Sequence, residues 1–206
     1  MNAKNLFRYD NVRFTAGIHP SNACEWSQHT KQLVENAIKE TEKYVMYGEF
    51  GLDYDRLNCS PKDVQIRCFR VQLVLAKQSG LPLFLHCRNA CEDFFSILRE
   101  FETQNDYNFR GVVHSFTGSL QELHIILQTP FYVSVNGCAM KEQFQLDAIR
   151  EIPTDKLILE TDCPYCGISL NHAGYKFVKT QFKSKQPEKY ESGCMVKGRN
   201  EPCTLV

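Results

Sequence analysis

The stretch Leu81-Pro82-Leu83-Phe84-Leu85-His86 decides the fold class, because a continuous apolar run ends there in a histidine. Such a run is typical of a strand that is buried on both faces of a parallel sheet, whereas a half-exposed strand alternates apolar and polar residues. The stretch therefore predicts an internal parallel strand with a polar side chain at its carboxyl end.

Comparable apolar runs recur on both sides of this stretch, and amphipathic segments separate them. The expected strands are Arg13 to Ile18, Tyr44 to Gly48, Leu81 to Leu85, Gly111 to Val113, Phe131 to Val135 and Leu157 to Glu160. The expected helices are Gln32 to Lys43, Pro61 to Gly80, Ser119 to Pro130, Cys91 to Phe101 and Lys141 to Arg150. This alternation predicts an α/β domain of parallel strands joined by right-handed crossovers.

Two of these helices have recognisable ends. Ser60 is expected to cap the first of them, with Pro61 at its first position and Gly80 at its end. Ser119 and Glu122 form a capping box for the second. The apolar stripe of the first helix is expected to consist of Val64, Cys68, Val71 and Leu75.

The composition bounds the function classes. The 206 residues carry 24 basic and 24 acidic side chains, so a strongly basic surface that binds nucleic acid by charge alone is excluded. The length suits one domain but is short for an eight-unit α/β barrel, which takes about 250 residues. No apolar stretch resembles a signal peptide or a membrane span, which predicts a cytoplasmic or nuclear protein that is not secreted and contacts no membrane.

The ten cysteines are expected to be mostly small buried side chains of a reduced protein. Cys163-Pro164-Tyr165-Cys166 has the spacing of a redox or zinc-binding pair, but no second pair completes a four-ligand zinc site. The segment from Lys176 to Arg199 holds seven basic and two acidic residues, with aromatic residues between them. It is either a solvated loop or a surface that contacts phosphates.

Four expected strands end in a side chain that can bind a metal or transfer a proton, namely Glu49, His86, His114 and Asp162. The carboxyl ends of parallel strands meet at one face, which is where active sites of α/β proteins form. Two imidazoles and two carboxylates suit zinc, manganese or a similar divalent ion better than magnesium.

Other polar residues carry weaker signals. His19 ends the first strand and either faces the same site or lies apart from it. His124 is expected within a helix, either on its surface or packed, and His29 is expected at the start of a helix. Asp53 and Asp55 are expected to be turn and cap residues rather than ligands.

Five motifs then appear in the order and spacing of the TatD-type deoxyribonucleases, and the sequence is most similar to their eukaryotic branch. They are Gly17-Ile18-His19-Pro20, Gly48-Glu49-Phe50-Gly51-Leu52-Asp53, Leu85-His86-Cys87-Arg88, Val113-His114-Ser115-Phe116 and Glu160-Thr161-Asp162-Cys163-Pro164. His172-Ala173-Gly174 and Gly198-Arg199-Asn200-Glu201-Pro202 fit the same branch.

The resemblance implies a TIM-type barrel of the amidohydrolase-like class that hydrolyses phosphodiester bonds of DNA. The expected substrate class is single-stranded DNA or DNA ends. It implies one or two divalent ions, Zn, Mn or Mg, bound by Glu49, His86, His114 and Asp162. Glu49 and Asp162 are the implied catalytic residues, and Asp162 would handle the nucleophilic water. His19, Arg88 and His172 are expected to contact the substrate.

The sequence also departs from the family. Members begin with two further strand units, the first carrying a His-x-His motif, and continue into a final helix, so residues 1–206 are expected to form one domain with about six of the eight units. Cys203-Thr204-Leu205-Val206 is interpreted as a truncation rather than a prenylation box. A catalytically impaired shortened form, or a related metallohydrolase of esters or amides, remains an alternative.

Overall fold

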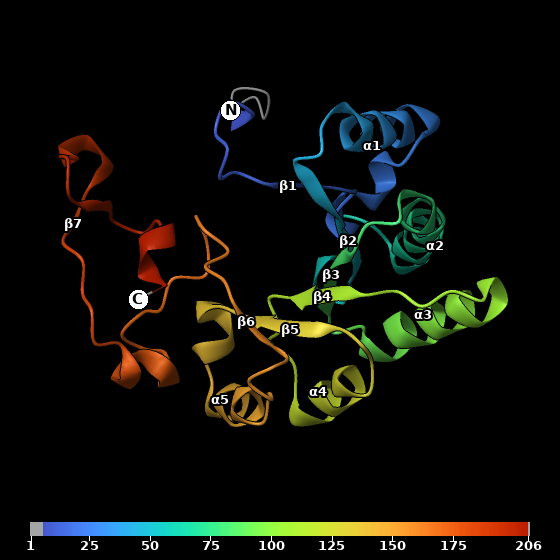
Figure 1. Ribbon diagram of the computed structural model, residues 1–206. Helices are drawn as coiled ribbons and strands as arrows, with labels where there is room; N and C mark the ends of the chain where they lie inside the picture. The colour runs from blue at the N-terminus through green and yellow to red at the C-terminus, as the bar shows by residue number, and fades with distance from the viewer. Residues whose placement is uncertain (1–5, 206) are drawn as a thin grey trace. The chain divides into compact units, whose positions relative to one another are not determined.

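The structure is a computed structural model that describes residues 6–205 (Figure 1). The chain divides into two compact units, one ending at Val112 and one beginning at Val113. The larger sheet has the strand order β1-β2-β3-β4-β5-β6, which is the order along the chain, and the pairs β1–β2, β2–β3 and β5–β6 are parallel. The predicted α/β class with six strands is therefore confirmed, and the described strands form an open sheet rather than a closed barrel.

The first unit alternates strands and helices, and Figure 1 shows its helices lying beside its strands. Phe50, Phe69 and Phe94 are among the side chains of its core. Its elements are β1 (Phe14–Ala16), a 3₁₀ turn (Pro20–Glu25), α1 (Gln28–Glu40), β2 (Tyr44–Asp53), a 3₁₀ turn (Tyr54–Arg56), α2 (Lys62–Ser79), β3 (Leu83–Arg88) and α3 (Cys91–Asn105).

The second unit begins within β4 (Gly111–His114) and also alternates strands and helices up to β6. Its later part consists of 3₁₀ turns and a two-stranded sheet. Its further elements are α4 (Leu120–Leu127), β5 (Tyr132–Val135), a 3₁₀ turn (Gly137–Met140), α5 (Gln143–Arg150), β6 (Leu157–Leu159), β7 (Ser184–Lys185), β8 (Met195–Val196), and the turns Ala173–Phe177, Pro187–Lys189 and Pro202–Thr204.

Two strands are longer than predicted, so the polar residues at their expected ends lie inside them. β2 continues to Asp53 and contains Glu49, and β3 continues to Arg88 and contains His86. Gly48 suggests a strand end in the sequence, but here it is part of the strand. Its φ of 152° and the carbonyl of Phe84, with which a Cβ would collide, require glycine.

The start of helix α2 differs from the sequence analysis. Its N-cap is Pro61 rather than Ser60, whose hydroxyl instead donates to Ser21 O at 3.0 Å. Gly80 ends the helix in the left-handed conformation as predicted, and Ser119 and Glu122 form the predicted capping box of α4.

The predicted apolar stripe of α2 is wrong in part, because Val71 is 40% exposed while Gln65 and Gln72 are buried. The amide of Gln72 pairs with both backbone groups of Ile18, accepting from N at 2.7 Å and donating to O at 3.0 Å. The amide of Gln65 pairs in the same way with Asp53, at 2.8 Å to each group. Glutamine is buried here because it satisfies the backbone at the ends of two strands.

The boundaries of other helices also differ. α1 begins at Gln28, four residues earlier than expected, because Ser27 and Thr30 form a capping box. α3 continues past Phe101 to Asn105, and α5 begins at Gln143, two residues later than expected, after a 3₁₀ turn that ends at Met140.

The expectation of mostly buried cysteines is wrong. The structure describes all ten, none in a disulfide, and only Cys68 and Cys91 are buried. His29 and His124 lie on α1 and α4, as predicted, and both are exposed. Within residues 6–205, no helix is both long and apolar enough to cross a membrane.

Candidate metal centre

Three predicted site residues of the first unit lie close together, namely His19 after β1, Glu49 in β2 and His86 in β3. Glu49 Oε1 lies 2.7 Å from Nδ1 of His86 and 3.4 Å from Nε2 of His19. The rings of His19 and His86 are edge to face, with their centroids 4.6 Å apart. Ligand atoms from the three side chains all lie within 4.8 Å of one another, so among the described residues these three form a group that could hold a metal ion.

The sheet explains why Glu49 and His86 meet. β2 and β3 are parallel neighbours, and their register shifts between Gly48 and Phe50, where Glu49 is the extra residue. A bulge changes the direction in which a side chain points, and bulges often occur beside active sites. The irregularity therefore directs Glu49 toward His86 on the neighbouring strand.

His86 also contacts Asp53, which the sequence suggested only as a turn residue. Nε2 of His86 lies 3.0 Å from Oδ2 of Asp53, and Oδ1 of Asp53 accepts from the backbone N of Asp55 at 3.0 Å. The turn role is thus confirmed, but the contact with the imidazole was missed. Burial alone would raise the pKa of Asp53, yet the hydrogen bond and charge of His86, with the charge of Arg88, lower it.

His19 follows β1 and caps the 3₁₀ turn that begins at Pro20. Its Nδ1 accepts from the backbone N of Ser21 at 3.1 Å and lies 2.6 Å from the Ser21 hydroxyl. A neutral ring whose Nδ1 accepts carries its hydrogen on Nε2, the atom that faces Glu49. In this arrangement His19 offers a hydrogen-bond donor to the cluster rather than a metal-binding lone pair.

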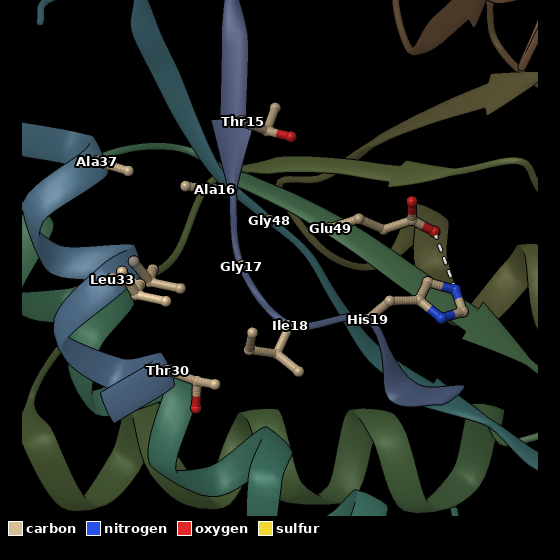
Figure 2. Close-up of a pocket in the computed structure, with 11 residues that line it drawn as sticks. Thr15, Ala16, Gly17, Ile18, His19, Thr30, Leu33, Ala37, Gly48 and Glu49 are labelled. Carbon is tan, nitrogen blue, oxygen red and sulfur yellow. Dashed lines mark ion pairs between the residues drawn. The ribbon is translucent and has the colours of Figure 1, made fainter. Parts of the chain in front are cut away.

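A pocket of about 380 Å³ lies beside this cluster, between β1, β2 and α1. Its wall is mostly apolar, with Ile18, Leu33 and Ala37 among the lining residues, and His19 and Glu49 line it too. Figure 2 shows the side chains of His19 and Glu49 directed toward one another at one end of it. The cluster is therefore partly accessible, as a substrate site requires.

Arg88, the last residue of β3, is half-buried, and its charge contributes to the lowered pKa of Asp53. It belongs to the same unit as the cluster, which is compatible with its predicted contact with substrate.

In the second unit, His114 ends β4 and is buried beside Glu160. Nδ1 of His114 lies 3.4 Å from Oε1 of Glu160. Glu160 in turn accepts from Ser134 Oγ at 2.7 Å and from Asn136 Nδ2 at 2.9 Å. Burial alone would raise the pKa of Glu160, but the hydrogen bond and charge of His114, together with Ser134 and Asn136, lower it.

Asp162, the fourth predicted ligand, lies in the loop after β6 with a φ of 50°. Its Oδ2 lies 3.2 Å from the thiol of Cys166, which donates to it. Asn200 fixes this loop, since its Nδ2 donates to Thr161 O at 2.9 Å and its N donates to Pro164 O at 3.0 Å. A hydrogen bond with Cys138, then burial and the contact with Asp162, raise the pKa of the Cys166 thiol.

The Cys163–Cys166 pair shows neither a disulfide nor a metal cluster, and Cys163 is exposed. His172 is half-exposed, and its Nδ1 accepts from Ser169 N at 3.4 Å. In the basic segment, Lys185 pairs with Glu191 at 2.6 Å, and Arg199 pairs with Glu201 at 2.8 Å. Phe177, Phe182 and Tyr190 are exposed.

The donor set of the first unit fits a divalent cation. The carboxylate of Glu49 and the imidazole of His86 converge, and zinc and manganese accept such mixed oxygen and nitrogen ligands. Sequence reasoning missed Asp53 and Glu160 as partners of the two histidines, although both lie in motifs that it quoted. For Asp53 the signal was a carboxylate at the end of β2, the strand next to that of His86. Glu160 follows β6, which is two strands away from β4, so no neighbouring-strand signal pointed to its contact with His114.

Comparisons with known proteins agree with this geometry. The model of the family "TatD related DNase" matches residues 2–198. The chain is 43% identical to the deoxyribonuclease Tat-D of Schizosaccharomyces pombe, over 95% of this chain and 65% of that protein. It is 41% identical to the 3'-5' ssDNA/RNA exonuclease TatD of a Rahnella species, over 73% of this chain and 57% of that protein.

A crystal structure of a hydrolase TatD family protein from Entamoeba histolytica matches with a TM-score of 0.87 and 33% identity, covering 98% of this chain and 69% of that one. The chain thus spans less than two thirds of the length of the two relatives compared by sequence. Because the family model covers nearly the whole sequence and the fold matches a member's structure, this chain belongs to the TatD related DNase family.

Proposed function

We propose that the protein is a divalent-metal-dependent hydrolase that cleaves phosphodiester bonds of DNA. The observation that carries this proposal is the convergence of Glu49, His86 and His19 in a member of the TatD related DNase family. The names of the Schizosaccharomyces pombe and Rahnella relatives, a deoxyribonuclease and an exonuclease of single-stranded DNA and RNA, support the choice of substrate.

The proposed metal ligands are Glu49 and His86 from the first unit and His114 and Asp162 from the second. When bound, a divalent ion would polarise the phosphoryl group and lower the pKa of a water molecule toward about 7. Glu49, with its oxygen between two imidazoles, supplies negative charge to the centre. One or two ions of zinc, manganese or magnesium are proposed, of which the mixed donor set favours the first two.

The remaining proposed roles belong to the chain's own donors and acceptors. Asp162 accepts the proton of the attacking water through its carboxylate. Nε2–H of His19 donates to a phosphate oxygen, because the cap at Ser21 keeps the hydrogen on that atom. Arg88 and His172 contact the phosphate backbone, and Asp162 and Glu49 are the catalytic residues.

The proposed substrate is single-stranded DNA or a DNA end, which the exposed Lys176–Arg199 segment would hold. Lysine side chains interleaved with the exposed Phe177, Phe182 and Tyr190 suit phosphates and unstacked bases. We propose the cytoplasm or the nucleus as the site of action.

The test is release of nucleotides from a labelled single-stranded DNA oligonucleotide, with Mg²⁺, Mn²⁺ or Zn²⁺ added to the chelator-treated chain. Glu49→Gln and Asp162→Asn should each lower the rate by about a hundredfold or more, because each removes charge that acts on the reacting phosphate. Glu122→Gln, which alters a helix cap on α4, is the matched control and should keep the wild-type rate. Metal-independent cleavage, or full activity of both variants, would contradict the proposal. Cleavage of a nitrophenyl ester but not of DNA would show that the substrate is an ester rather than DNA.

A further inference from the structure

Each of the two histidines in the proposed metal site has a carboxylate partner that is not itself a proposed ligand. In the first unit His86 pairs with Asp53, and in the second unit His114 pairs with Glu160. The two pairs use different ring nitrogens, Nε2 of His86 and Nδ1 of His114.

Asp53 is held so that its carboxylate cannot turn away from His86. Its side chain is 2% exposed, Oδ2 faces Nε2 of His86, and Oδ1 accepts from the backbone of Asp55. Its own backbone N and O are both bonded to the amide of Gln65. Because a buried carboxylate oxygen is destabilised when no hydrogen-bond donor faces it, Oδ2 of Asp53 favours the hydrogen on Nε2 of His86.

His86 has a second carboxylate, that of Glu49, on its other nitrogen, but the two carboxylates differ in exposure. The side chain of Glu49 is 30% exposed, so water or a cation can solvate it, whereas Asp53 depends on protein donors. A cation can therefore take the place of the hydrogen between Nδ1 and Glu49 while Nε2–H stays on Asp53.

Glu160 is held by a different set of donors, and it too fixes the hydrogen of its histidine on one ring nitrogen. Ser134 Oγ donates to Oε2 and Asn136 Nδ2 donates to Oε1, which leaves the carboxylate facing Nδ1 of His114. Asn136 is itself fixed, since its Oδ1 accepts from Cys138 N at 2.9 Å. A hydrogen on Nδ1 places the lone pair of a neutral imidazole on Nε2.

We propose that Asp53 and Glu160 are positioning residues, which fix opposite tautomers of the two histidines so that Nδ1 of His86 and Nε2 of His114 each carry a lone pair that can bind metal. Carboxylates bonded to the far nitrogen of a metal-binding histidine orient the ring and raise its basicity, and their loss typically weakens metal binding by about 10–100-fold. The inference rests on the metal site of the proposed function and adds which atom of each ring binds.

The tautomers can be measured without metal, by nitrogen NMR of the full chain with ¹⁵N-labelled histidine in alkaline buffer. The wild-type chain should show the hydrogen of His86 on Nε2 and that of His114 on Nδ1. Asp53→Asn should shift only the first ring toward a mixture, and Glu160→Gln only the second. Unchanged tautomers in both variants would overturn the inference.

Zinc affinity, measured by chelator competition, gives a second readout. Asp53→Asn and Glu160→Gln should each raise the dissociation constant about 10–100-fold. The matched controls Asp55→Asn, which touches Asn89 rather than a histidine, and Glu122→Gln should stay within about twofold of the wild type. Variants that bind zinc as tightly as these controls would also overturn the inference.

These outcomes separate the inference from the proposed function. If the wild-type chain bound no zinc and cleaved no DNA, the proposed function would fail, while the ring tautomers would still decide the role of Asp53 and Glu160. If Asp53→Asn did not fold, Glu160→Gln would test the same statement in the other unit. Glu160→Asp, which restores the charge, should recover part of the affinity.

Discussion

The two units both place a histidine beside a buried carboxylate, but they hold that pair in different ways. In the first unit, glutamines of α2 bind the backbone at Ile18 and Asp53, next to the residues of the cluster. In the second unit, Ser134 and Asn136 bind the carboxylate of Glu160 itself. The first pair therefore depends on the packing of a helix against strand ends, and the second depends on the charge of one side chain.

The largest effect expected from this difference is on the stability of the first unit. Gln65→Leu keeps the approximate volume of the side chain but leaves the buried N and O of Asp53 without their partner. We expect the free energy of unfolding to fall by about 2–4 kcal/mol, since each buried polar group left unsatisfied costs roughly 1–3 kcal/mol. Urea denaturation followed by circular dichroism measures this loss.

Gln78→Leu is the matched control, because Gln78 lies on the same helix but is exposed. Its effect should stay within about 0.5 kcal/mol. An equal loss of stability in the two variants would show that α2 holds the strand ends by general packing rather than through its buried amides.

A smaller effect is expected in the second unit. Ser134→Ala removes the donor that lies 2.7 Å from Glu160, and hydrogen bonds to charged groups contribute about 1.5–3 kcal/mol. We expect unfolding at neutral pH to become easier by about 1–2 kcal/mol, at the lower end because Asn136 continues to donate to Glu160.

The pH dependence of stability tests whether the cost of Ser134→Ala comes from the charge of Glu160. Because the pKa of Glu160 in the folded chain is lower than its ordinary value of 4.5, its contribution to stability is complete above that pH and is lost as the pH falls through the folded pKa. The cost of Ser134→Ala should therefore shrink in acid. A cost that is the same at neutral and acidic pH would point to packing instead.

The sequence predicted the six strands, most helices and the family, because apolar runs and helix caps are local patterns. It did not predict the length of β2, since the expected strand ended at Gly48 although the strand continues to Asp53. Nor did it predict the burial of Gln65 and Gln72, because their partners are backbone groups far away in the sequence. Polar residues buried by pairing with a distant backbone leave no local pattern.

The same limit applies to the site. Glu49 and His86 were predicted as neighbours because strand ends meet at one face of a parallel sheet, and the structure places them in contact. Asp53 was assigned to a turn. This is correct for Oδ1, which accepts from Asp55 N, but the contact of Oδ2 with His86 was overlooked. Because one carboxylate can serve two partners, a local motif reveals only the partner that is close in sequence.

The smallest effect is expected at Asp162, whose described contact is with a thiol rather than an imidazole. Cys166→Ala removes this donor, and a hydrogen bond of this kind contributes about 0.5–1.5 kcal/mol. If the thiol orients the carboxylate of Asp162, the rate of DNA cleavage should fall roughly two- to tenfold. Cys166→Ser keeps a donor at nearly the same place and should retain more activity than the alanine variant. Equal rates for the two variants would mean that the thiol does not orient Asp162, and that Asn200, through Thr161 and Pro164, holds the loop without it.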